Sequence, residues 1–274
     1  MLTGAVVAAG VLAGAGVAWA VDADLQAIGG RGQAASSATP SVGDVGAPGP
    51  AADPSTAPAV LAATEPPSPE PTAVGIDLAR YPTTDPASLW VVVNKQHAVD
   101  PLDYAPTGLL WVDGGMVRGD VAPDLRAMVA AAKADGVRLS LRNGYRSYRD
   151  QVVVHGDVVN RAGAAYADGV SARPGYSEHQ TGLAFDLHSA SQPSCDLAPC
   201  FSGTTEAVWV AAHAWEHGFV VRYTPENTAT TGYQPEAWHL RYVGPELAAW
   251  MHANGVGSLE EAFGISGGPD YAAG

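Results

Sequence analysis

Cysteine is scarce in this sequence of 274 residues, which contains only Cys195 and Cys200. Their spacing is too wide for the redox Cys-x-x-Cys motif, and the absence of a second pair excludes a structural zinc site built on cysteine pairs. Two interpretations stay open, namely free thiols or a local disulfide in a protein outside the cytoplasm. We favour the disulfide.

Basic residues are also scarce, since 14 Lys and Arg stand against 28 Asp and Glu and the net charge at pH 7 is −14. The basic residues are scattered singly, so no surface is expected to follow a phosphate backbone. We therefore expect no nucleic-acid partner. The sequence has no Ser-x-x-Lys motif and no Walker lysine, which argues against penicillin-binding serine enzymes and P-loop proteins.

Charged residues are missing from residues 4–21, a run rich in Ala, Val and Gly. Ala18-Trp19-Ala20 fits the small-x-small rule for signal cleavage, but no Lys or Arg precedes the run as in an ordinary signal peptide. Its length is also just enough to span a bilayer. Residues 1–21 are thus predicted to be a signal peptide or a membrane anchor, and both alternatives stay open.

The rest of the chain divides by composition into three parts. Residues 22–75 are dominated by Ala, Pro, Ser, Thr and Gly, which bury too little apolar area to offset the cost of ordering, so a disordered linker is expected. One globular domain is expected over residues 76–266, because 47% hydrophobic content can build a substantial core. Residues 267–274 are expected to form a flexible C-terminal tail.

The globular part mixes helix and strand signals. Pro123 opens a helix over residues 124–133 that Gly136 ends, and Ser147 with Asp150 has the capping-box spacing of a helix start. Further helices are expected at residues 205–217, 245–253 and 258–263. Strands are expected at residues 89–95, 137–142, 183–187, 219–223 and 238–243.

Two stretches far apart in the sequence carry the residues for a metal site. The first, SEHQTGLAFD, begins at Ser177, and the second, EAWH, begins at Glu236. A catalytic zinc ion needs three nitrogen or oxygen ligands and one open position for water, and His179, Asp186 and His239 supply such a set. Glu236 precedes one ligand by three residues, where a carboxylate can accept a proton from zinc-bound water.

These stretches match the patterns Ser-x-His-x-x-Gly-x-Ala-x-Asp and Glu-x-Trp-His, and the sequence thereby resembles the zinc D-alanyl-D-alanine carboxypeptidases of the VanY type, within a wider group of DD- and LD-peptidases. The similarity covers about residues 76–255. It includes, in the same order, VNK at 93–95, GYRSYRDQ at 144–151, GFVVRY at 218–223 and WHLRYVG at 238–244. The resemblance implies an α+β fold with a small central antiparallel sheet flanked by helices, as in the DD-peptidase and hedgehog group.

The resemblance also implies the roles of the site residues. His179, Asp186 and His239 would hold zinc, and Glu236 would be the catalytic carboxylate. Arg146 would bind the substrate or the charge of the tetrahedral intermediate. The expected reaction is zinc-dependent removal of the terminal D-alanine from peptidoglycan stem peptides or precursors ending in D-Ala-D-Ala, by a secreted or membrane-anchored monomer.

Three further side chains are candidates for the substrate site or its wall. Ser177 and Gln151 could each donate hydrogen bonds to the substrate or serve as turn and capping residues, and both interpretations stay open. Trp238 is expected to pack against the ligand strand.

The forked donors of Arg146 suit a carboxylate or an oxyanion. A cation gains nothing from the start of a helix, which favours a functional role for this side chain.

Other functions compete with this interpretation. His213 to His217 has the His-x-x-Glu-His pattern of another zinc peptidase class, but no residue is an evident further ligand. A related endopeptidase could cut a different bond of the stem peptide. An inactive zinc-holding module that binds the wall is the other alternative, and the intact Glu236 argues against it.

Overall fold

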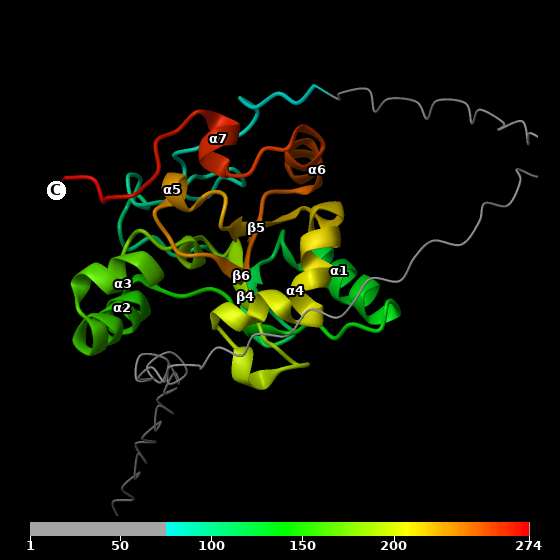
Figure 1. The fold of residues 1–274 in the computed structure, drawn as a ribbon. Coiled ribbons are helices and arrows are strands. Elements are labelled where there is room, and N and C mark those ends of the chain that lie inside the picture. Colours follow the sequence, from blue (N-terminus) through cyan, green and yellow to red (C-terminus); the bar gives the residue numbers. More distant parts are fainter. Residues whose placement is uncertain (1–74, 274) are drawn as a thin grey trace, which may run out of the picture. The chain divides into compact units, whose positions relative to one another are not determined.

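The computed structural model of the protein describes residues 75–273 (Figure 1). The predicted signal peptide or anchor at residues 1–21, and the predicted linker apart from its last residue, lie outside the described residues. Over residues 75–273, no helix is both long and apolar enough to cross a membrane.

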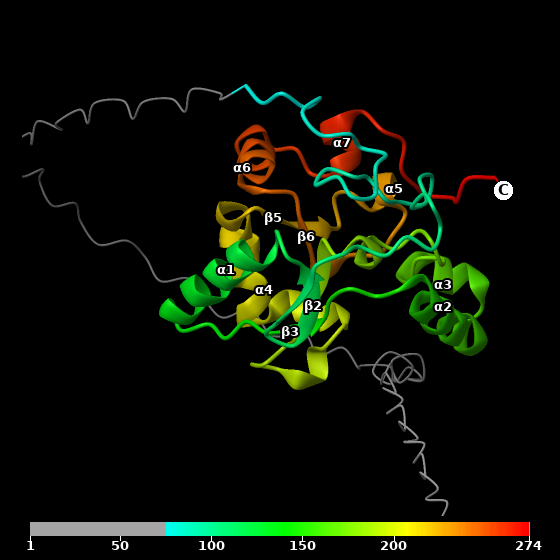
Figure 2. The ribbon, with the colours of Figure 1, turned by 180° about the vertical axis from the view of Figure 1, so that it is seen from behind.

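A four-stranded antiparallel sheet lies at the centre of the described part. Its strand order is β3 (Leu141–Asn143), β4 (Ala184–Leu187), β6 (Glu236–Tyr242) and β5 (Phe219–Tyr223). A separate hairpin of β1 (Leu109–Val112) and β2 (Gly115–Arg118) lies beside β3, as Figure 2 shows. The small central sheet confirms the predicted fold class.

Helices surround this sheet (Figure 1). In both views, α2 (Tyr148–Ala162) and α3 (Ala164–Val170) lie together on one side of the strands, and α1 (Ala122–Ala134) and α4 (Thr205–His213) lie on the other. The remaining helices are α5 (Thr228–Thr231), α6 (Pro245–Asn254) and α7 (Leu259–Phe263).

Local signals account for several helix ends. Ser147 caps α2 as predicted, because its Oγ accepts a hydrogen bond from the Asp150 amide at 3.2 Å and its own amide donates to Asp150 Oδ2 at 3.3 Å. After α4 a 3-10 turn continues to His217, and Gly218 ends it with a φ of 83°, a left-handed conformation that favours glycine.

The alternation along β4 and β6 separates the core from the face that carries the candidate ligands. Phe185 and Leu240 are register partners and are fully buried, and the Phe185 ring lies 5.4 Å from that of Phe219. The next pair in the register is Asp186 and His239. Since successive side chains of a strand point to opposite faces, the packing of the first pair directs the second pair away from this core.

The segment at residues 89–95 differs from the predicted strand. It is largely buried but belongs to neither sheet. Its one β-bridge is the isolated pairing of Asn94 with His97, just beyond the segment. The guanidinium of Arg241 donates to the carbonyl oxygens of Leu89 at 3.1 Å and Val91 at 2.8 Å. A buried side chain thus supplies hydrogen bonds that a neighbouring strand would otherwise provide.

The C-terminal residues 267–273, which were predicted to be a flexible tail, make contacts with the domain. Lys95 Nζ donates to the carbonyl oxygen of Pro269 at 2.9 Å, and the amide of Ala272 donates to the carbonyl oxygen of Lys95 at 3.0 Å. The Tyr271 hydroxyl lies 3.1 Å from that of Tyr233. These contacts extend the folded domain beyond the predicted boundary at residue 266.

The two cysteines form the predicted disulfide, with Cα atoms 5.3 Å apart. It closes a short loop within the connection between β4 and α4. In the same connection Asp196 accepts hydrogen bonds from the Ser189 amide at 2.5 Å and from His188 Nδ1 at 2.6 Å. The disulfide and these hydrogen bonds together constrain the chain directly after the strand that carries Asp186.

Gly144 gives the first testable prediction, because a Cβ at this position would collide with the carbonyl oxygen of Met116 and lie 3.0 Å from the amide nitrogen of the same residue. We expect Gly144→Ala to destabilise the fold by about 1–3 kcal/mol in urea unfolding. An added Cβ at Gly156, inside α2, would meet nothing within 4 Å beyond the backbone of its own helix, so Gly156→Ala should stabilise the fold by about 0.5–1 kcal/mol. Equal changes in the free energy of unfolding for the two substitutions would contradict the predicted collision between a side chain at position 144 and Met116 of β2.

Candidate metal centre

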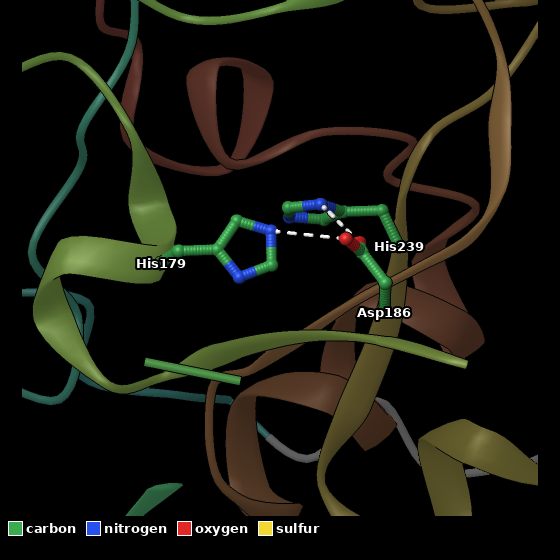
Figure 3. Close-up of side chains that lie close together, drawn as sticks. All are labelled: His179, Asp186 and His239. Carbon is green, nitrogen blue, oxygen red and sulfur yellow. Dashed lines mark ion pairs between the residues drawn. The ribbon is translucent and has the colours of Figure 1, made fainter. Parts of the chain in front are cut away.

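Three side chains from different elements converge beside the sheet (Figure 3). His179 lies on the 3-10 helix Glu178–Thr181, Asp186 on β4 and His239 on β6. One ligand atom from each lies within 4.8 Å of the others, and all three residues are buried. Among residues 75–273, no other group of three His, Cys, Asp or Glu side chains converges in this way.

Asp186 lies between the two imidazoles. Its Oδ2 is 3.4 Å from His179 Nε2 and its Oδ1 is 3.1 Å from His239 Nδ1. The two rings are 4.9 Å apart and nearly perpendicular, at 84°. The nitrogens that face the aspartate are therefore of different kinds, Nε2 in one histidine and Nδ1 in the other.

The turn that carries His179 is tied to the chain after β3. His179 Nδ1 donates to the carbonyl oxygen of Gly144 at 2.8 Å, and the amide of Arg146 donates to the carbonyl oxygen of His179 at 3.2 Å. Gly182 ends the turn with a φ of 70° and leads directly into β4. Since Nδ1 is the donor, the Nε2 lone pair of His179 is available to a ligand.

The residues fit a zinc ion in number and chemistry. Asp186 Oδ2 accepts a hydrogen bond from Asn143 Nδ2 at 2.7 Å, whereas the buried Oδ1 has no hydrogen-bond partner. A buried acceptor without a donor is costly, and a cation beside it would remove that cost. Two imidazoles and one carboxylate are a set that a catalytic zinc ion takes.

Glu236 begins β6 beside this cluster, with its Oε2 3.6 Å from His239 Nδ1. Burial raises the pKa of Glu236 to about 8, and the charge of Asp186 adds to the increase while His239 and Arg146 oppose it. A carboxyl group with a pKa near neutrality can both accept and return a proton. Glu236 therefore lies beside the candidate ligands, and its predicted role in proton transfer stays a prediction.

The two histidines have opposite pKa shifts. Burial lowers the pKa of His179, and the charge of Arg146 lowers it further. Burial also acts to lower the pKa of His239, but the neighbouring carboxylates of Asp186 and Glu178 outweigh burial and raise the value to about 9. A proton and a metal ion therefore compete for His239 Nδ1.

Arg146 lies at the point where the chain passes from β3 to α2, and its Nε is buried without a hydrogen-bond partner. Burial lowers the pKa of this guanidinium, and the charges of Asp186 and Glu236 oppose the shift. An arginine remains charged under such conditions. Its unpaired donor near two site carboxylates suits it to an anionic group of a bound molecule.

The two remaining substrate-site candidates are both buried. Gln151 Nε2 donates to the carbonyl oxygen of Ala172 at 2.5 Å, while its Oε1 has no partner. This hydrogen bond joins α2 to the segment that leads to the metal centre, and the substrate-binding role of Gln151 stays a prediction. Ser177 directly precedes the 3-10 helix that carries His179.

The predicted wall residue Trp238 is partly buried and packs against the core, with its ring 6.2 Å from that of Phe201. The competing His-x-x-Glu-His pattern lies elsewhere. His213 Nδ1 is 3.2 Å from Glu216 Oε1, and His213 and His217 both pack on Trp209, with ring centroids 5.0 and 6.3 Å away. These histidines have a packing role on the helix surface, and over residues 75–273 they are joined by no third ligand.

Residues 264–268, with the letters GISGG, fit the spacing of a serine-hydrolase elbow. That elbow needs a strand that turns sharply into a helix, whereas these residues follow α7 and continue into the C-terminal segment. The structure therefore gives Ser266 no nucleophile geometry.

Sequence reasoning missed two side chains that support the ligands. Asn143 donates to Asp186, as described above, and Glu178 Oε2 lies 3.4 Å from His239 Nε2. Glu178 falls at a variable position of the first motif, directly before a ligand. Nothing in its local sequence distinguishes it from an exposed glutamate, so only its buried position reveals it.

Comparisons with known proteins show that the chain is similar to peptidases. A family model described as "VanY: D-alanyl-D-alanine carboxypeptidase" matches residues 115–245. YodJ of Bacillus subtilis (strain 168) is 37% identical over 189 residues, which are 65% of this chain and 68% of YodJ.

Two solved structures are also similar. The LdcB LD-carboxypeptidase has a TM-score of 0.60 and 36% identity, with coverage of 66% of this chain and 88% of that chain. A zinc complex of the vancomycin-resistance D,D-pentapeptidase VanY has a TM-score of 0.54 and 30% identity, with coverage of 64% and 98%.

Proposed function

Because the chain belongs to the VanY family of D-alanyl-D-alanine carboxypeptidases, we propose that it is a zinc-dependent peptidase that removes the terminal D-alanine from peptidoglycan stem peptides or their precursors. The observation that carries this proposal is the convergence of His179, Asp186 and His239 with Glu236 at 3.6 Å from one of them. Three ligands and a nearby carboxylate are what metal-assisted peptide hydrolysis requires.

Each side chain has a distinct task in this proposal. His179, Asp186 and His239 would hold the zinc ion, which when bound lowers the pKa of a water molecule and polarises a carbonyl group. Glu236 accepts the proton of the attacking water and later delivers it to the leaving amine of D-alanine. Its position beside the candidate ligands supports this role, because its Oε2 lies 3.6 Å from His239 Nδ1.

Arg146 binds the negative charge of the substrate carboxylate or of the tetrahedral oxyanion. We expect Arg146→Lys to reduce kcat/KM by about 10²-fold or more, because an ammonium group cannot reproduce the forked donors of a guanidinium. Steady-state kinetics on a D-Ala-D-Ala peptide measure the effect. Arg149→Lys, on the exposed start of α2, is the matched control and should leave kcat/KM unchanged; equal losses in both variants would remove Arg146 from the site.

An L,D-carboxypeptidase is a second candidate for the bond that is cut. It is favoured by the similarity to LdcB and by the 41% identity to the L,D-carboxypeptidase DacB from Streptococcus pneumoniae, of which the chain covers 89%. The three candidate ligands and Glu236 are compatible with hydrolysis of either bond, because they do not by themselves define the pocket for the penultimate residue of the substrate.

Two peptides distinguish these functions. The purified protein is incubated with a stem pentapeptide ending in D-Ala-D-Ala and with the tetrapeptide that lacks the last residue, each with and without a chelator, and the products are identified by mass spectrometry. Loss of D-alanine from the pentapeptide alone supports the D,D-activity, and loss from the tetrapeptide supports the L,D-activity. Cleavage inside the stem would indicate an endopeptidase, and no chelator-sensitive cleavage of either peptide would refute the proposal.

We also propose that the protein acts outside the cytoplasm, released or anchored through residues 1–21. The disulfide between Cys195 and Cys200 supports this location, because disulfides persist in oxidising compartments. The uncharged run at residues 4–21 supports it independently. Detection of the protein only in the cytoplasmic fraction of its source cells would contradict the proposal.

A further inference from the structure

Glu178 is a fully buried carboxylate that borders the metal centre without being one of its three candidate ligands. Its Oε2 lies 3.4 Å from His239 Nε2. Its Oε1 accepts hydrogen bonds from Arg222 Nε and Arg241 Nη1, both at 2.9 Å. Two guanidinium groups in contact with this buried carboxylate balance a negative charge on it.

Other partners fix the two arginines that hold this carboxylate. Arg222 makes a two-pronged contact with Glu260 on α7, with its Nη1 and Nη2 at 2.9 and 2.7 Å from the two carboxylate oxygens. Arg241 donates to the carbonyl oxygens of residues 89 and 91. Both arginines that bind Glu178 Oε1 thus have further buried partners, and Glu178 Oε2 faces His239.

The two histidines of the centre face Asp186 through different nitrogens, and each is held by an acceptor on its far side. His179 Nδ1 donates to the carbonyl oxygen of Gly144, which leaves its Nε2 facing Asp186. In His239 the arrangement is reversed, since Nδ1 faces Asp186 Oδ1 at 3.1 Å and Nε2 faces Glu178. An acceptor on one imidazole nitrogen determines which nitrogen carries the proton.

We propose that Glu178 is the positioning residue of the metal centre, which keeps the proton of His239 on Nε2 and so presents Nδ1 to the metal ion. The inference rests on the proposed function, since it assumes that the centre binds a metal. Glu178 acts only through His239, and Arg222, Arg241 and Glu260 hold it in place. The buried ion pairs thereby connect α7 to a metal ligand on β6.

A glutamine at this position cannot satisfy the same neighbours. Both Glu178 oxygens accept hydrogen bonds, one from two arginines and the other from His239, whereas a glutamine has one oxygen and one donor group. If its oxygen faced the arginines, its amide would face His239 Nε2 and favour a proton on Nδ1, which is the nitrogen that the metal needs. If its oxygen faced His239, its amide would meet two arginine donors.

The test compares Glu178→Gln with Glu206→Gln, a matched change at a carboxylate that is equally buried, bonds Ser191 and does not touch the ligands. Zinc affinity is measured by competition with a chromophoric chelator at a temperature where circular dichroism shows all proteins folded. We expect Glu178→Gln to bind zinc about 10–100-fold more weakly and Glu206→Gln to bind it like the wild type. The cobalt-substituted Glu178→Gln protein should also have shifted visible absorption bands.

Equal zinc affinity of Glu178→Gln and wild type would overturn the inference while leaving the proposed function intact. A wild-type protein that binds no zinc would refute the metal centre itself, so the two failures are distinguishable. If Glu178→Gln does not fold, nitrogen-15 histidine NMR of the wild type loaded with cadmium-113 decides the question. Cadmium should couple to one Nδ1 and one Nε2, and coupling to two Nε2 nitrogens would overturn the inference.

Discussion

Glu236→Gln is expected to lower kcat by about two to four orders of magnitude while leaving the metal in place. The substitution keeps the size of the side chain but removes the group that accepts and returns a proton, and general acid–base catalysis contributes about 10²–10⁴ to a rate. Glu236 lies 3.6 Å from His239 Nδ1 but is not one of the three converging ligands. Metal content should therefore stay at one zinc ion per chain by elemental analysis.

Glu226 provides the matched control for this experiment, because it is exposed and lies on the loop after β5. Glu226→Gln should have wild-type kcat, which shows that loss of one acidic charge is not itself harmful. Wild-type turnover by Glu236→Gln would mean that another group accepts the proton. Loss of zinc together with activity would instead make Glu236 part of the metal site.

Asp186→Asn is expected to weaken zinc binding by more than about 100-fold. Loss of a residue that only hydrogen-bonds a metal ligand typically weakens binding by about 10–100-fold, so the loss of a ligand itself should have a larger effect. The substitution removes the only anionic ligand and leaves a neutral oxygen that cannot match it in attracting a dication. Activity should be lost at ordinary zinc concentrations.

Thermal unfolding gives a second measure of the same substitution. A ligand that binds only the folded state stabilises it by about 4 kcal/mol at a free concentration 1,000 times its Kd. Chelation should thus lower the Tm of the wild type clearly and that of Asp186→Asn hardly at all.

Asp196→Asn is the control, because Asp196 also contacts a histidine, His188 at 2.6 Å, but lies outside the converging cluster. It should keep the chelator-sensitive Tm of the wild type. Loss of zinc from Asp196→Asn would mean that the metal lies elsewhere. Unchanged zinc affinity in Asp186→Asn would exclude Asp186 as a ligand.

Elements with local signals could be predicted from the sequence. The helix that begins after Ser147 depends on a cap four residues long, and β4 depends on the alternation around Phe185, which separates a core side chain from a ligand. The convergence of His179, Asp186 and His239 was likewise predicted, although their sequence separation reaches sixty residues. That prediction depended on short motifs with fixed spacing and on the resemblance they carry.

Elements that depend on distant partners could not be predicted in this way. Residues 89–95 have the composition of a strand, but the Arg241 side chain, about 150 residues away, bonds two of their carbonyl groups. Residues 267–273 contain two glycines and a proline, which suggested a tail, yet Lys95 and Tyr233 contact them on the domain. The hairpin of β1 and β2 is an exception, because it was not predicted although Asp113-Gly114 between its strands is a local signal for a hairpin turn.

The sequence by itself determined the kinds of ligand, the spacing that places Glu236 beside one of them, and the alternation that puts Asp186 and Phe185 on opposite faces of a strand. These features follow from backbone geometry within a few residues, which neighbouring side chains alone control. Only the tertiary structure decided which nitrogen of each histidine faces the centre and that Glu178, Arg222, Arg241 and Glu260 form one buried network behind it. Orientation of an imidazole depends on the acceptor that the fold brings to its far side, and that acceptor comes from another part of the chain.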